Sequence, residues 1–456
     1  MSLFSNQLSV APLITDYRLL ITEYTPTSSY NRIKLMKAQA EAGSLRPFLT
    51  LWIGQAISLL GSQLVQFALI WWLTQSTGSA IVLTTASLVG LLPQVILGPF
   101  VGVLVDRWNR RWTMFLADSG VMVATLLLAL LFWLGVAQLW HVYAILFLRA
   151  VAGSFHWPAM TASTSLMVPD EHLTRIQGLN QMLNGGLNII AAPLGALLVS
   201  LMPLQAILLI DAATALFAIV PLLFVVVPQP AQAEVLGVSP TVTFWEDMKV
   251  GLRYVRNWPG LLILMGLAMI INFLVHPTIA LLPLLVTNHF HGGAYHLSAI
   301  EVGIGVGIIA GGVTLSGWGG FRKKITTSLV GLIGISVGLL VIGFTPATLF
   351  WLAVGGMFVS GFMMSLANGP VMAIIQSVVA PEKQGRVLTL LVSFSSGMAP
   401  IGLIFAGPLA EAFGVQVWFL LSGAIMLVLG SASFLVPALI KIEEEAPMYQ
   451  KTAVSN

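Results

Sequence analysis

Long apolar runs separated by short polar segments fill this chain of 456 residues from about residue 48 to residue 438. A helix that crosses a bilayer needs about 20 mainly apolar residues. The pattern therefore predicts an all-α integral membrane protein with twelve transmembrane helices in two six-helix halves. The predicted spans are 48–74, 79–104, 112–134, 139–160, 174–201, 205–227, 259–285, 299–320, 325–345, 349–375, 387–410 and 416–438.

The positive charges indicate how these spans are oriented. All but one of the 20 Lys and Arg residues fall in the tails or in loops on one side of the predicted bundle. Because cytoplasmic loops retain Lys and Arg, both termini are expected in the cytoplasm. The exception is Arg149, inside the fourth span. A cation at this depth is costly and tends to face a bundle interior or a cavity, which makes Arg149 a functional candidate.

The composition excludes several classes of protein. With 57% hydrophobic and 8% charged residues, the chain differs from soluble domains, in which roughly 25% of residues are charged. Its net positive charge follows from the loops and does not indicate nucleic-acid binding. The absence of cysteine excludes disulfides and thiolate sites. His289, His291 and His296 share one predicted outer loop, but no metal-binding motif accompanies them. No metal or cofactor is expected.

Polar stretches divide the chain into five segments. We predict a cytoplasmic tail over 1–45, a six-helix half over 46–227, a cytoplasmic linker with an amphipathic helix over 228–258, a second half over 259–438 and a tail over 439–456. No cleavable signal peptide is apparent, and Met36 is an alternative start.

The two halves match at a shift of 212 residues, which places Pro158 on Pro370 and Arg110 on Arg322. Repeated halves are typical of secondary transporters with the substrate path at the interface between the repeats.

The loop after the second span carries a motif, Gly102-Val-Leu-Val-Asp106-Arg107-Trp-Asn109-Arg110-Arg111. It resembles the G-x-x-x-D-R-x-G-R-R/K motif of the major facilitator superfamily. Asn109 replaces the second glycine, and Asn also tolerates positive φ. Arg149 with Gly153 resembles the R-x-x-x-G motif of the same family. The resemblance implies a charged latch that closes the cytoplasmic side, formed by Gly102, Asp106, Arg107, Arg110, Arg111, Arg322 and Lys323.

Within the superfamily, the chain resembles the macrolide-efflux branch of drug/proton antiporters. The stretches WIGQAISLLGS at 52–62, FHWPAM at 155–160 and HPTIALLPL at 276–284 carry this likeness. The Gly-Pro-x-x-Gly-Gly antiporter motif is only partly present, as Ala-Pro-Leu-Gly-Ala at 192–196. The resemblance implies efflux of an amphipathic, macrolide-like drug across a bacterial cytoplasmic membrane by alternating access, driven by the proton gradient.

Four ionisable residues inside the spans are candidates for proton coupling: Asp118, Arg149, Asp211 and Glu301. A carboxylate in a low-dielectric cavity holds a proton more tightly than one in water, and a nearby arginine opposes this effect. A conformational change that alters either influence couples proton movement to transport. The alternative is a static pair between Arg149 and a carboxylate that holds helices together.

Uncharged polar residues form stripes on several spans. In the first span they recur at spacings of three and four residues and therefore share one helical face. Such stripes beside aromatic residues suit a large, partly apolar ligand, although hydrogen bonds between helices explain them equally. The candidate cavity residues are Trp52, Gln55, Ser58, Ser62, Gln66, Gln181, Asn184, Asn188, Asn272 and His276.

Two spans carry glycines four residues apart, at Gly303, Gly307 and Gly311 and at Gly98 and Gly102. Small residues at this spacing let helices approach closely, so close helix contacts are expected at both places.

Other functions stay open at this point. An exporter of an endogenous metabolite such as a siderophore or lysolipid fits the same features, as does a non-transporting receptor or scaffold. A membrane-embedded enzyme is not expected, because no HExxH, GxSxG or Walker motif is present. The expected partners are a small-molecule substrate and the lipid bilayer, with no nucleic acid, and a monomer as the working unit.

Overall fold

A computed structural model describes residues 45–229, 249 and 251–444, and all the long elements in this part are α-helices. Most of the predicted linker and tails lies outside the described residues. The first half contains α3 (Arg46–Thr77), α4 (Ala80–Arg107), α5 (Arg110–Trp133), α6 (Leu139–Met167), α7 (Asp170–Leu201) and α8 (Leu204–Phe224). The second contains α10 (Pro259–Leu284), a π-helical turn η1 (Leu285–His289), α11 (Ala294–Trp318), α12 (Lys324–Phe344), α13 (Phe350–Val378), α14 (Pro381–Phe413), α15 (Val415–Ser433) and α16 (Pro437–Ile440).

Eleven of the described helices are long and apolar enough to cross a membrane, which makes the chain a multi-pass membrane protein. Helix α6, with 29 residues, is not among the eleven. Arg149 and two histidines, His141 and His156, lower its mean hydropathy. The prediction of twelve spans includes α6 as the fourth. It therefore depends on the place of α6 in the bundle rather than on its composition.

Short loops set the antiparallel order of successive helices. Gly78, with φ of 61°, ends α3, and the Ser79 side chain then accepts a hydrogen bond from the Val82 N–H to begin α4. Glycine readily adopts the left-handed backbone conformation that ends a helix, and serine is a favoured N-cap. At the far end of α11, Gly319 with φ of 78° has the same terminating role.

Glycines bring α11 and α13 into close contact. A Cβ atom added at Gly307 would lie 2.3 Å from the Phe358 carbonyl oxygen, and one added at Gly311 would lie 2.2 Å from that of Phe362. The prediction for this span is confirmed. For Gly98 and Gly102 it is wrong in this conformation, because both are exposed and no described atom lies within 4 Å of a Cβ at either position.

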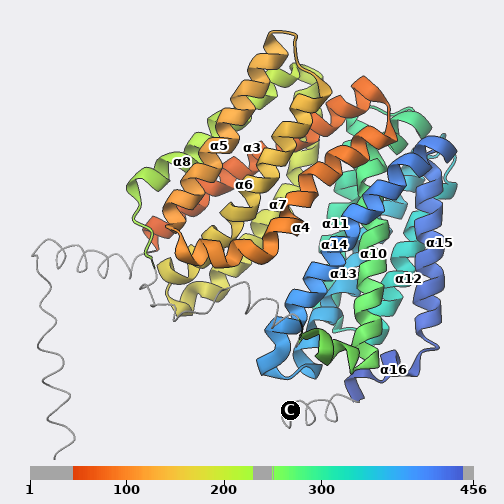
Figure 1. The fold of residues 1–456 in the computed structure, drawn as a ribbon. Coiled ribbons are helices and arrows are strands. Elements are labelled where there is room, and N and C mark those ends of the chain that lie inside the picture. The colour runs from red at the N-terminus through yellow and green to blue at the C-terminus, as the bar shows by residue number, and fades with distance from the viewer. Residues whose placement is uncertain (1–44, 230–248, 250, 445–456) are drawn as a thin grey trace, which may run out of the picture.

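The two halves form two bundles that lie side by side (Figure 1), with α4 packed on α14 and α7 packed on α11. We define the basic end as the end with the α4–α5, α6–α7, α11–α12 and α13–α14 loops, and the opposite end as the other. At the opposite end Glu411 joins the halves: its Oε2 accepts hydrogen bonds from the Ala80 N–H at 2.8 Å and the Ser79 hydroxyl at 3.2 Å. Ser200 and Tyr295 add a contact of 2.9 Å there.

Two polar contacts at the basic end join elements of the same half. Lys323 pairs with Glu444 at 2.9 Å, and Arg110 donates to the Ala162 carbonyl at 2.9 Å. The end of the predicted linker is partly described: residues 251–256 are helical, and Trp258 is fully buried in the second half. This conformation therefore closes the opposite end by contacts between the halves.

We predict that Gly311→Ala lowers the stability of the protein, because its Cβ would meet the α13 backbone and overpacking costs about 1–3 kcal/mol. The matched control is the next residue, since a Cβ at Gly312 meets no described atom within 4 Å. Thermal unfolding of the two variants in detergent checks this. Equal melting temperatures for both would contradict the close contact between α11 and α13.

Candidate functional site

A cavity of about 590 Å³ lies where the two halves meet, and both halves line it. The first half contributes α3, α4, α6 and α7, and the second contributes α10, α11 and α14. Apolar side chains such as Phe67, Leu187 and Leu297 make up much of the wall. Six of the residues singled out in the sequence also line it: Ser62, Gln66, Arg149, Asn188, His276 and Glu301.

Three polar residues in the wall, Gln63, Ser87 and Gln94, did not figure in the sequence prediction. Gln63 lies next to the predicted stripe on α3, and Ser87 and Gln94 are both on α4. Their spacing of seven residues places them on one helical face two turns apart. This spacing was the available signal, and it was weak because each residue is isolated in an apolar run.

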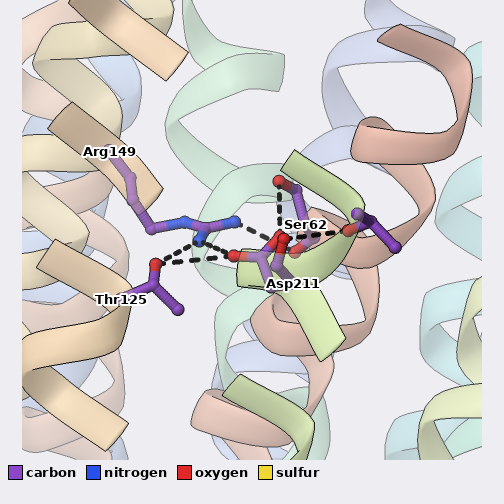
Figure 2. Close-up of polar contacts among 5 residues, drawn as sticks. Ser62, Thr125, Arg149 and Asp211 are labelled. Carbon is purple, nitrogen blue, oxygen red and sulfur yellow. Dashed lines mark hydrogen bonds and ion pairs between the residues drawn. The ribbon is translucent and has the colours of Figure 1, made fainter. Parts of the chain in front are cut away.

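Arg149 forms a buried ion pair with Asp211 (Figure 2), with 2.6 Å between Nη1 and Oδ2. The two side chains are 12% and 4% exposed. Ser62 donates to Asp211 at 3.1 Å, and the second guanidinium nitrogen of Arg149 donates to the Ser62 carbonyl at 3.2 Å. Thr125 accepts from Arg149 at 3.3 Å. One network thus connects α3, α5, α6 and α8.

This network resolves the choice of partner for Arg149 in the present conformation. Of the three acidic candidates, Asp211 neutralises it, and Arg149 donates further to the Thr125 hydroxyl and the Ser62 carbonyl. A buried charge loses its hydration and is tolerated when paired and hydrogen-bonded. The guanidinium still borders the cavity, so the pair lies between the core of the first half and the central space.

A second polar network lies two helical turns from the first, toward the basic end. Gln55 donates to Asp118 at 2.9 Å, and Nε2 of His156 lies 3.4 Å from the other Asp118 oxygen. The structure therefore places Gln55 and Asp118 together, as residues of this network rather than of the cavity wall. His156 is a residue that the sequence prediction missed, although it follows Arg149 on the same face of α6.

The remaining cavity candidates are located elsewhere in the structure. Trp52 donates its indole N–H to Asn180 at 2.7 Å, which connects α3 to α7. Asn272 donates to the Ala268 carbonyl of its own helix at 2.8 Å. Three further candidates also lie outside the described cavity wall: Ser58, Gln181 and Asn184. In this conformation Trp52, Gln55 and Asn272 form hydrogen bonds within or between helices, which is the alternative to lining the cavity.

The loop motif fastens neighbouring helices at the basic end. Arg111 donates to the carbonyls of Leu222 and Leu223 in the last turn of α8, where a cation complements the helix dipole. Asn109 has φ of −68° and caps α5 by accepting from the Trp112 N–H at 3.2 Å. The expected use of positive φ is therefore wrong, because this position needs an N-cap. The Asp106 and Arg107 side chains lie outside the described part.

The basic residues of the second half behave similarly. The Lys323 ammonium bonds to the Glu444 carboxylate and lowers its pKa. Lys324 lies 3.6 Å from Glu443, and Arg322 is exposed. Among the described residues no group of three or more His, Asp or Glu side chains is arranged to hold a metal ion.

Comparisons with known proteins agree with this architecture. A family model described as Major Facilitator Superfamily matches residues 51–400 and 323–454. Macrolide efflux protein A of Streptococcus pyogenes is 35% identical over 380 residues, which cover 83% of this chain and 93% of the relative. The protein of the same name from Enterococcus faecalis is 33% identical over 326 residues, covering 72% and 100%.

A solved structure titled nucleoside transporter NupG resembles the chain with a TM-score of 0.64, covering 84% of this chain and 97% of that one. At 13% sequence identity, this likeness concerns the fold alone.

We predict that Asp211→Leu destabilises the protein by about 3–5 kcal/mol, because it leaves Arg149 buried without its counter-ion. The double variant Arg149→Met, Asp211→Leu is expected to recover most of this loss, since no unpaired charge remains. Thermal unfolding of the single and double variants measures both effects. A double variant less stable than the single variant would contradict a mainly structural pair.

Proposed function

Because the chain belongs to the Major Facilitator Superfamily, in its macrolide-efflux branch, we propose that it exports an amphipathic small molecule of the macrolide type. Transport would follow alternating access, in which the two halves rock about a central site. The observation that carries the proposal is the cavity between the halves, whose volume lies within the range of small-molecule sites, about 300–1,000 Å³.

The character of the cavity wall supports an amphipathic substrate. Isolated amide and hydroxyl groups, among them Gln63, Gln66 and Asn188, stand among leucine, isoleucine and phenylalanine side chains. Polar groups placed singly in an apolar wall fix the orientation of a ligand, while the apolar surface provides most of the burial. Trp52 and Gln55, which engage other residues in this conformation, are not needed for this site.

The proposed topology has twelve spans, with the basic end and both termini in the cytoplasm of a bacterium. Helix α6 is included because it packs between α4 and α5, both of which meet the length and hydropathy criteria. The Lys and Arg residues of the loops support the orientation. The structure would then represent an inward-facing state, with Glu411 and Tyr295 closing the outer side.

The latch and the energy source complete the proposal. Asp106 with the basic residues of its loop would hold the cytoplasmic side closed in the other state, and so bias the equilibrium between two conformations. A proton gradient would drive export, with Asp118, Asp211 and Glu301 as the acidic groups available. Of these, Glu301 borders the cavity directly, and Asp211 does so through its partner Arg149.

The experiment is an accumulation assay in a drug-hypersensitive, pump-deficient bacterium that expresses the chain. We expect lower accumulation of a radiolabelled macrolide than in cells with an empty vector, and a return to the control level on addition of a protonophore. Immunoblotting of the membrane fraction controls for expression. Equal accumulation in both strains would overturn macrolide export and favour an endogenous substrate. Lower accumulation that persists with the protonophore would overturn proton coupling.

A further inference from the structure

The polar residues of the first half form two layers along the same helices. Gln55 and Ser62 on α3, Asp118 and Thr125 on α5, and His156 and Arg149 on α6 are each separated by seven residues. Seven residues span about two turns, or about 10 Å along the helix axis. The layer of Ser62, Thr125 and Arg149 contains the pair with Asp211. The layer of Gln55, Asp118 and His156 lies nearer the basic end.

The two layers differ in the charged or titratable group that faces their carboxylate. Asp211 faces a guanidinium and accepts further from Ser62 and Thr125, so adding a proton to it would strand a buried cation. Asp118 faces a histidine, whose Nε2 is buried and lies 3.4 Å from the carboxylate. A carboxylate beside an imidazole exchanges a proton without leaving a permanent charge unpaired.

We propose that Asp118 and His156 together form the proton-binding site of this transporter, an assignment that rests on the proposed function. With one proton bound, the pair is neutral overall, as a carboxylate with an imidazolium or as a carboxylic acid with an imidazole. When the proton leaves to water, the pair carries one negative charge. A net charge in a low-dielectric bundle is costly unless water reaches it, so release is favoured in a state open to solvent.

The accessibility of the pair in this conformation fits that role. The Asp118 and His156 side chains are 14% and 17% exposed, so the site is enclosed but not sealed. Its only described polar partner is the uncharged Gln55. The other ionisable residues of the first-half helices α3 to α8 are Arg46, Asp106, Arg107, Arg110, Arg111, His141, Tyr143, Arg149, Asp170, Glu171, His172, Arg175 and Asp211.

Helix α6 connects this pair to the loop that contains the proposed latch. Phe155, next to His156, stacks on Trp108 with ring centroids 5.6 Å apart and planes inclined by 20°. About two turns further along α6, the Ala162 carbonyl accepts from Arg110. Pro158 lies between these two contacts and removes a backbone hydrogen bond within α6, which permits bending at that point. A change in the charge of the pair therefore acts on the helix that contacts Trp108 and Arg110 of this loop.

The test uses the full chain in proteoliposomes, with a pH-sensitive dye inside and a radiolabelled macrolide as the probe. The wild-type protein is expected to move protons opposite to the macrolide. In Asp118→Asn and His156→Gln, this proton flux should fall at least roughly tenfold. Exchange of labelled for unlabelled macrolide, which needs no net proton movement, should stay close to the wild-type rate. Asp118→Glu, which keeps a carboxylate, should restore part of the flux.

Ser163→Ala is the matched control on α6, because this buried hydroxyl bonds to the Ala159 carbonyl of its own helix. It should keep both proton flux and exchange. Wild-type proton flux per macrolide in Asp118→Asn or His156→Gln would overturn the assignment. So would a parallel loss of flux and exchange in both variants, since that result indicates a structural role. A wild-type protein that does not exchange macrolide would instead overturn the proposed function, and the assignment with it.

Discussion

A charge inside a low-dielectric helical bundle must be neutralised, and this constraint governs the first half of the protein. Arg149 satisfies it through Asp211 at 2.6 Å, and it also donates to the Ser62 carbonyl of α3 and the Thr125 hydroxyl of α5. Four helices meet at this network, so it fixes their mutual rotation. Because Arg149 is neutralised within its own half, it can border the cavity without forming an ion pair with the other half.

The second half is held together by a different means. Glycines on α11 and α12 allow backbone contact with α13, as at Gly311 against Phe362 and at Gly331 against Ala367. Each half is thus tightly connected internally, by an ion network in one and by close helix packing in the other. Within the part of the chain that the structure describes, Glu411 and Tyr295 make polar contacts between the halves at the opposite end. Motion between two rigid units about the cavity is the movement that such a distribution of contacts favours.

The sequence was sufficient to predict the helices and the charged residue at the centre of the first half. Hydropathy and depth in the membrane can be read from each helix separately. It predicted that Arg149 is special, but not which of three acids neutralises it. That choice depends on how helices are rotated against one another, which residue spacing within one span does not specify. Helix rotation also decides that Gln55 bonds to Asp118 instead of lining the cavity. It likewise places His156 beside Asp118, which the sequence did not predict. Gly98 and Gly102 show that a spacing permits a close contact without enforcing it.

In the proposed transport cycle, the cavity opens alternately at the two ends as the halves rock. The chain has no cysteine, so cysteine pairs for spin labels can be introduced directly. One pair, at Glu171 and Gly385, reports on the basic end, and another, at Leu134 and Trp351, reports on the opposite end; all four positions are exposed. Distances measured by pulsed electron resonance, with and without macrolide at acid pH, test the claim. We expect a new population in which the first distance shortens while the second lengthens. Distances that stay fixed, or that change in the same direction, in a labelled protein that still transports would contradict it.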